Sequence, residues 1–156
     1  MSNKNPKHID CLWGLICSMS AIDQQNNNIS LFNIINQINV PFGTFGKEKD
    51  FISPRPHELM VVFRRVVPSK LCTNVLVLDV KVSLIDPLGK ALSEMLVPIK
   101  FDAGKRIMRF RFQIPGFKLT NPGDYVYRVE TRQPSSDQME KVSEIPFEAI
   151  EMTENK

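Results

Sequence analysis

Histidine and cysteine are scarce in this sequence, whose 156 residues include two histidines and three cysteines. Neither a Cys-x-x-Cys pair nor a second histidine pair is present, so the usual ligands of a structural zinc site are missing. The cysteines are odd in number and lie inside apolar runs: Cys11, Cys17 and Cys72. They do not suit a disulfide framework and predict buried, reduced thiols. Reduced thiols are typical of the cytoplasm, the compartment that we expect.

Long apolar runs are also lacking. No segment approaches the roughly 20 apolar residues that a membrane-spanning helix needs. Residues 11–19 are apolar, but nothing like the small-residue cleavage site of a secretory signal follows them. We therefore expect neither export nor a membrane partner.

Neither sign of charge dominates. The sequence has 20 basic and 17 acidic residues and a formal net charge of +3. This balance argues against a strongly electrostatic nucleic-acid binder, although it leaves room for a local basic patch.

Alternation of apolar and polar residues is the strongest positive signal. Residues 74–85, 108–114 and 125–131 alternate in this way, which indicates strands with one face in a core. Weaker strands are predicted over residues 12–22, 29–40, 58–67, 92–101 and 142–150. No stretch reads as a helix.

A polar turn and a proline indicate the positions of some of these strands in the sheets. The polar turn over residues 23–28 joins the first two strands and predicts a β-hairpin. In its second strand, Phe32 and Ile34 are expected to share one face with Ile38 and Val40. Pro98 cannot donate to a ladder, so its strand is expected at a sheet edge or at a bulge.

About eight strands separated by short turns predict an all-β fold. Parallel strands need long crossover connections, so the sheets should be mainly antiparallel. One apolar face per strand favours an antiparallel two-sheet sandwich, with a barrel as the alternative. The length suits one domain over residues 11–150, with flexible ends at residues 1–10 and 151–156.

Four segments carry a family resemblance, and they occur in the family's order. They are Leu15-Ile16-Cys17 running to Asp23, Ile29-Ser30-Leu31-Phe32-Asn33-Ile34-Ile35 with Ile38, Ile85-Asp86-Pro87-Leu88-Gly89, and Pro122-Gly123-Asp124-Tyr125-Val126-Tyr127-Arg128-Val129. Together they resemble a family of small bacterial proteins known as a domain of unknown function. The Asn-rich turn stands where that family usually has glycine. The resemblance implies an immunoglobulin-like sandwich in a bacterial cytoplasm and transfers no catalytic or binding residue.

Candidate metal ligands are few. His8, Asp10 and Cys11 are close in sequence, but on an extended strand Cys11 points away from the other two. Three aspartates lie in predicted turns: Asp86, Asp102 and Asp124. A calcium site needs several carboxylates converging from neighbouring loops, whereas each of these has a turn-forming role. We expect no metal and no cofactor.

Nucleophilic catalysis would require a thiolate beside a base. His57 could pair with Cys17 or Cys72, but a reactive cysteine needs a polar, partly open setting. Cys17 instead follows Ile16 in an apolar run. We therefore assign no catalytic residue and expect the protein not to be an enzyme.

The first candidate partner surface is the loop over residues 41–56, which is long for an internal connection. It carries four large apolar side chains: Phe42, Phe45, Phe51 and Ile52. These side chains either fold back over one end of the sandwich or meet a protein partner.

The second candidate surface is a sheet face with four arginines: Arg109, Arg111, Arg128 and Arg132. An immunoglobulin-like strand order would make residues 58–67, 106–114 and 125–132 neighbours. The stripe could contact a few phosphates, but the nearby aromatic residues are assigned inward and offer no base stacking. Glu58 and Glu130 would pair across strands, so we expect a neutralised face and no nucleic-acid partner.

The function favoured by these features is a non-enzymatic binding or assembly module of a bacterial or phage-like complex. Its partner would be another protein or a second copy of the chain. A carbohydrate-binding sandwich and a hydrolase with an unrecognised site are the alternatives. An exposed apolar patch would favour an assembly module. A platform of aromatic side chains would favour a sugar-binding domain, and a polar pocket would favour an enzyme.

Overall fold

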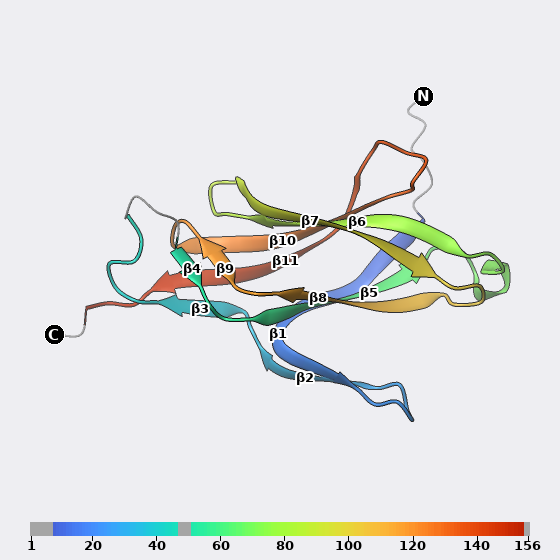
Figure 1. Cartoon of the computed structure of the whole chain (residues 1–156), viewed down its shortest axis with the longest axis horizontal. Coiled ribbons are helices and arrows are strands. Elements are labelled where there is room, and N and C mark those ends of the chain that lie inside the picture. Colours follow the sequence, from blue (N-terminus) through green and yellow to red (C-terminus); the bar gives the residue numbers. More distant parts are fainter. Residues whose placement is uncertain (1–7, 47–50, 155–156) are drawn as a thin grey trace.

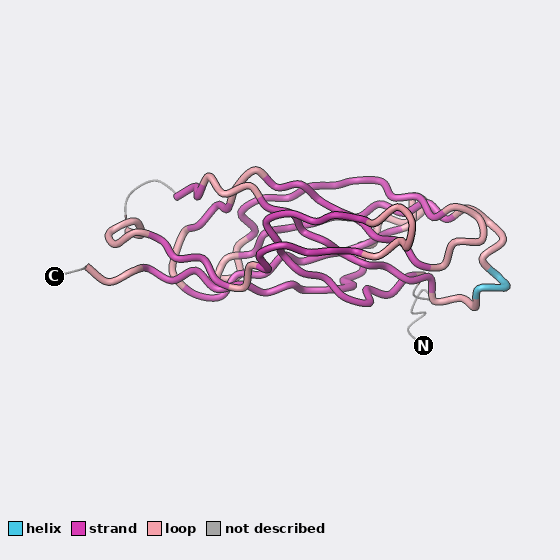
Figure 2. Tube along the Cα trace, turned by 90° about the horizontal axis from the view of Figure 1, so that it is seen from below, coloured by secondary structure: helices cyan, strands magenta, loops and turns pink. Residues whose placement is uncertain are grey.

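The computed structural model describes residues 8–46 and 51–154, which form an elongated all-β molecule (Figure 1). Eleven strands occur in these ranges: β1 (Ile9–Ile22), β2 (Ile29–Ile34), β3 (Gln37–Val40), β4 (Phe51–Ser53), β5 (His57–Arg65), β6 (Leu76–Ile85), β7 (Ala91–Phe101), β8 (Ile107–Ile114), β9 (Phe117–Leu119), β10 (Gly123–Arg132) and β11 (Glu140–Glu151). They run along the length of the molecule, and loops gather at both ends (Figure 2).

Two large sheets form the body of the molecule. Sheet A has the strand order β2-β1-β5-β8, and sheet B has the order β3-β11-β10-β6-β7. A small third sheet joins β4 to β9 at one end. All strand pairs are antiparallel except β3, which runs parallel to β11. Sheet B is therefore mixed, and the prediction of mainly antiparallel sheets is confirmed, with β3 as the exception.

The described chain has more strands than the eight predicted because one predicted strand is split. Residues 29–40 form β2 in sheet A and β3 in sheet B, with a break at Ile35 and Asn36. Asn33 adopts a left-handed backbone with φ of 50° just before this break, a conformation that asparagine tolerates better than most residues. The two short strands β4 and β9 account for the rest of the difference.

The core lies between the two sheets, and it is formed by the apolar side chains that point inward at every second position of each strand. The inward residues of β5 and β6 are fully or almost fully buried: Leu59, Val61, Phe63, Leu78, Val80, Val82 and Leu84. They pack in one cluster with residues from β10 and β11. The predicted edge position of the Pro98 strand is confirmed, because β7 ends sheet B.

A tyrosine fixes the turn that leads into β10. Tyr125 is fully buried, and its hydroxyl accepts hydrogen bonds from the backbone nitrogens of Thr120 (2.9 Å) and Asn121 (3.0 Å). The same hydroxyl donates to the carbonyl oxygen of Asn121 at 2.7 Å. A tyrosine that bonds to backbone a few residues upstream resembles the tyrosine corner of β-sandwich domains.

The ends of the domain differ in part from the prediction. β1 begins at Ile9, which is 1% exposed and lies within the segment expected to be flexible. Residues 1–7 and 155–156 of the two predicted flexible ends lie outside the described residues. The only helical segment in the described ranges is the three-residue turn Ser69–Leu71, so no helix there is long enough to cross a bilayer.

Candidate functional site

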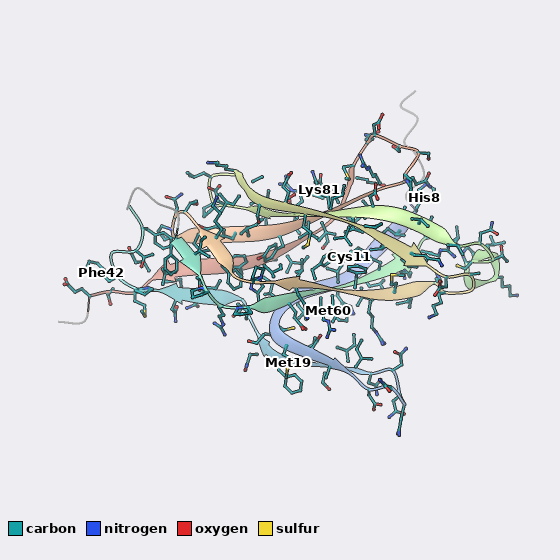
Figure 3. The ribbon with its side chains drawn as sticks, in the orientation of Figure 1. His8, Cys11, Met19, Phe42, Met60 and Lys81 are labelled. Atoms are coloured by element: carbon teal, nitrogen blue, oxygen red, sulfur yellow. The ribbon has the colours of Figure 1, made fainter. Side chains whose placement is uncertain are left out.

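The predicted loop over residues 41–56 is divided between core and surface. Phe45 and Phe51 are partly buried and pack against the hydrophobic core, whereas Phe42 and Ile52 are 59% and 65% exposed. Residues 47–50 lie outside the described residues. Phe42 lies at the end of the molecule near the C-terminal segment (Figure 3), where a shallow hollow is lined by Pro41, Phe42, Met152, Thr153 and Glu154.

Glu151, at the end of β11, holds the first part of this loop in place. Its carboxylate oxygen Oε1 accepts hydrogen bonds from the backbone nitrogens of Thr44 (2.9 Å) and Phe45 (3.3 Å). At the other end of the loop, β4 is paired with β9. The described parts of the loop therefore fold back on the domain, and only Phe42 and Ile52 of its four large apolar side chains face solvent.

The four arginines predicted to share one face lie in different sheets. Arg109 and Arg111 are on β8 in sheet A, whereas Arg128 and Arg132 are on β10 in sheet B. The expectation that β10 neighbours β5 and β8 is wrong, because β10 pairs with β6 and β11. The predicted arginine stripe therefore does not exist as one surface.

On sheet B, the outward charges are matched in pairs. Arg128 contacts Glu144 at 3.0 Å, and Arg132 contacts Asp79 at 3.1 Å. The pKa of Glu144 is lowered, mainly because Arg128 donates a hydrogen bond to its carboxylate. Glu130 contacts Lys81 at 2.7 Å on the same face. This face is a ladder of opposite charges and offers no net basic patch.

The two arginines of sheet A contact the first hairpin of the chain. Arg109 Nη1 donates a 2.7 Å hydrogen bond to Asn27 Oδ1 in the hairpin turn. Arg111 Nη1 lies 3.7 Å from Glu58 Oε1, and Glu58 Oε2 accepts a 2.6 Å hydrogen bond from the hydroxyl of Ser20. The hairpin is thus held over the outer face of sheet A at its base and at its tip.

This hairpin, formed by β1 and β2, leaves the body of the molecule (Figure 1). β1 pairs with β5 only as far as Cys17, and from Met19 to Ile22 it pairs with β2 alone. On the face of sheet A below the hairpin, Met60 and Val62 point outward by register but are 1% and 3% exposed. Figure 3 shows Met19 on the hairpin and Met60 in the sheet beside it.

Large apolar side chains remain exposed on the hairpin. Met19 and Phe32 are directly opposed across the two strands and are 53% and 44% exposed. Ile22 is 48% exposed and Ile34 is 61% exposed. Alternation predicts that Phe32 and Ile34 share one face with Ile38 and Val40, but only Ile38 and Val40 are buried. The signal that was missed is the lack of any charged residue in residues 18–22 and 29–35.

The buried polar pair of the core is His57 and Tyr127. A 2.8 Å hydrogen bond joins His57 Nε2 to the hydroxyl of Tyr127, and the imidazole stacks on Phe117 with ring centroids 3.6 Å apart. Burial lowers the pKa of His57 and raises the pKa of Tyr127. Both residues are 2% exposed, so the pair links β5 to β10 inside the core.

The three cysteines carry no disulfide. Cys17 and Cys72 are buried, and Cys11 is half-buried. Burial is the main cause that raises the pKa of Cys17, and the nearby carboxylate of Glu58 acts in the same direction. A raised pKa keeps this thiol protonated at neutral pH, which opposes nucleophilic chemistry.

Asp86 has the turn-forming role that the sequence suggested. Its oxygen Oδ1 accepts hydrogen bonds from the backbone nitrogens of Leu88 and Lys90, and Oδ2 accepts one from the hydroxyl of Thr120. Among the described residues, no group of three or more His, Cys, Asp or Glu side chains converges as metal ligands would.

No protein-family model and no curated protein matches this chain. Among solved structures, the C-terminal domain of Wzt is similar at 9% identity and a TM-score of 0.53, with 94% of this chain and 75% of that chain covered. At this identity the likeness shows the fold alone.

Two enzyme structures are similar at lower TM-scores. The Pseudomonas fluorescens alkylpurine DNA glycosylase AlkC, bound to DNA containing an abasic site analog, has 10% identity and a TM-score of 0.48. A family 123 glycoside hydrolase from Clostridium perfringens has 10% identity and a TM-score of 0.42. The chain covers 30% and 28% of these two structures, with 92% and 96% of its own length aligned.

Proposed function

We propose that this chain is a non-enzymatic binding or assembly module and that the β1–β2 hairpin is its partner-binding surface. The observation that carries the proposal is the opposed pair Met19 and Phe32, which are half exposed on a hairpin that has left the core. Ile34 extends the apolar surface along β2, two residues beyond Phe32, whereas Ile22, although exposed, points to the opposite face of β1 from Met19. Contiguous exposed apolar surface is the usual mark of a protein interface.

The way the hairpin is held supports this role. Ser20, Glu58 and Arg111 fix its base, and Asn27 and Arg109 fix its tip. A surface that is held in one orientation loses less conformational entropy on binding than a mobile one. Phe32 and Met19 belong to residue types that are enriched at the centre of interfaces.

The carbohydrate alternative has less support. Sugar-binding surfaces usually expose a row of Trp or Tyr rings, but Tyr125 and Tyr127 are 0% and 2% exposed. Trp13 is 40% exposed, but because both tyrosines are buried it has no second Trp or Tyr ring with which to form such a row. The hydrolase alternative is not favoured by a specific feature of the described residues.

The immunoglobulin-like class, the bacterial cytoplasmic setting and the family of unknown function remain part of this proposal. The tyrosine corner formed by Tyr125 and the packing of two sheets around one core support the immunoglobulin-like class. The hairpin replaces the 41–56 loop and the arginine stripe as the first candidate surface. The exposed Phe42 and Ile52 are a second, smaller candidate.

The test is affinity purification from the native host with three forms of the chain. The double variant Met19→Ser, Phe32→Ser removes the central apolar pair, and Leu96→Ser removes a side chain of equal exposure on β7. We expect a specific protein to be retained by the parent and by the β7 control and to be lost by the hairpin variant. Equal retention by all three forms would contradict the proposal.

A further inference from the structure

The outer edge of β2 is unlike the other outer edges of the two large sheets. A strand at the edge of a sheet presents unpaired N–H and C=O groups, which can pair with a strand from another chain. Sheet A ends in β2 and β8, and sheet B ends in β3 and β7. Natural proteins protect such edges with charged side chains, proline or short length.

Three of these four edges carry such protection. β7 contains Pro98 and the charged residues Glu94 and Lys100. β8 contains Arg109 and Arg111. β3 is only four residues long.

β2 has neither charge nor proline, and unlike β3, whose apolar residues Ile38 and Val40 are buried, it leaves Phe32 and Ile34 exposed. Its six residues, Ile29-Ser30-Leu31-Phe32-Asn33-Ile34, include no charge and no proline. Its partner segment in β1, from Met19 to Ile22, is also uncharged. The apolar residues Phe32 and Ile34 lie beside the open edge and are 44% and 61% exposed.

We infer that β2 pairs antiparallel with β2 of a second copy of this chain, so that two copies of sheet A join into one continuous sheet. The inference rests on the proposed function and names the partner of the same hairpin. A two-fold axis brings a surface against itself, so the surface must be complementary to itself. β2 meets that condition, because an uncharged strand opposes no like charges when it pairs with its own copy.

The charges around the hairpin agree with antiparallel pairing of two copies. Asp23, in the turn, is the charged residue nearest to β2 in the sequence on its N-terminal side. Antiparallel pairing places the two Asp23 turns at opposite ends of the joined edge, where they do not repel each other. Self-pairing of β8 would instead place Arg109 and Arg111 of one copy against those of the other.

The joined edge is short, which sets the strength of the association. Asn33, with φ of 50°, interrupts the extended backbone after Phe32 and leaves residues 29–32 as the regular edge. The half-exposed apolar side chains of the hairpin present on the order of 400 Å² per copy, about half of a standard specific interface, so the association is weak. The dimer should therefore form reversibly at micromolar or higher concentration. Because pairing occupies the open β2 edge of each copy and the other edges of the two large sheets are protected, assembly should stop at two copies.

The experiment is sedimentation velocity of the purified chain from about 1 to 500 μM, with charge variants at Phe32. We expect a reversible monomer–dimer equilibrium for the parent and at least a tenfold weaker dimer for Phe32→Lys and for Phe32→Glu, because a charged side chain on an edge strand opposes pairing with another strand. Leu96→Lys, on the protected β7 edge and 53% exposed in the parent, should dimerise as the parent does. Circular dichroism verifies that each variant is folded.

Several outcomes would overturn the inference. A parent that stays monomeric throughout this range contradicts it, as does a dimer that Phe32→Lys leaves unchanged. If the chain is monomeric but a different protein is retained through the hairpin in the affinity experiment, the second-copy inference fails and the proposed function stands. If neither association depends on the hairpin, both fail.

Discussion

The hydroxyl of Ser20 donates a 2.6 Å hydrogen bond to the carboxylate of Glu58, 38 positions later in the chain. Glu58 points outward from β5 but is only 8% exposed, and it also lies 3.7 Å from Arg111. One carboxylate therefore holds the base of the β1–β2 hairpin against sheet A. The hairpin's orientation, and with it the proposed binding surface, depends on this contact.

Replacing Glu58 by Ala should loosen the hairpin. The change leaves the buried hydroxyl of Ser20 without its acceptor, and an unsatisfied buried polar group costs about 1–3 kcal/mol. We expect a lower free energy of unfolding and faster amide hydrogen exchange in residues 18–34. Glu144→Ala, which breaks a more exposed pair with Arg128, should cost less than about 1 kcal/mol. Unchanged exchange in the hairpin of the Glu58 variant would contradict its anchoring role.

Tyr125→Phe should destabilise the domain more than Tyr127→Phe does. The Tyr125 hydroxyl satisfies the backbone nitrogens of Thr120 and Asn121 as well as one carbonyl oxygen, whereas the Tyr127 hydroxyl bonds to His57. We expect a loss of about 2–3 kcal/mol for Tyr125→Phe, because two backbone donors lose their acceptor. Denaturant unfolding of the two variants measures the difference. The reverse order would mean that the corner contributes little.

Stability should fall as the pH drops below about 6.5. Burial lowers the pKa of His57 in the folded protein from its ordinary value of 6.5, so the unfolded chain binds the proton more readily. The contribution of neutral His57 is complete above the unfolded pKa and is lost as the pH falls toward the folded pKa. Urea unfolding between pH 5.5 and 7.5 measures this slope. His57→Gln, which cannot titrate, should flatten it; an identical slope in that variant would assign the effect to other groups.

Cys17 should react slowly with alkylating reagents in the native protein. Its side chain is 0% exposed, and burial raises its pKa, so both access and thiolate content are low. We expect mass spectrometry to find Cys11, which is half-buried, modified before Cys17 and Cys72. Replacing Cys17 by Ala should cost about 1–2 kcal/mol. Rapid alkylation of Cys17 without unfolding would show that the hairpin base opens.

The 41–56 loop should behave as part core and part surface. Phe45→Ala and Phe51→Ala should each cost roughly 1–3 kcal/mol, because both rings pack against the core. Phe42→Ala and Ile52→Ala should change the free energy of unfolding by less than about 0.5 kcal/mol, as is usual at exposed positions. Thermal unfolding of the four variants provides the comparison. Equal effects at all four positions would contradict this division.

The local structure could be predicted from the sequence where alternation was strong. Residues 74–85, 108–114 and 125–131 correspond to β6, β8 and β10, and the polar turn after Ile22 joins a hairpin as expected. These features depend on neighbouring residues alone: side chains on a strand alternate between its two faces, and turn residues bond to nearby backbone. Pro98 likewise indicated an edge because of its own missing N–H group.

The candidate site could not be predicted in the same way. Alternation along the strands places Arg109, Arg111, Arg128 and Arg132 at outward positions, but it does not assign them to a sheet. Strand partners are chosen by contacts between distant segments, and β10 lies between β6 and β11 rather than beside β8. The arginines consequently divide between two surfaces.

Phe32 shows the same limit at the level of one residue. By itself the sequence determined that residues 29–34 form an alternating, uncharged strand after a polar turn. Only the tertiary structure decided that Phe32 faces solvent while Ile38 lies in the core. The chain breaks at Ile35 and Asn36, and β3 joins the other sheet beside β11. Alternation shows that a strand has two faces; what packs against each face depends on residues far away in the chain.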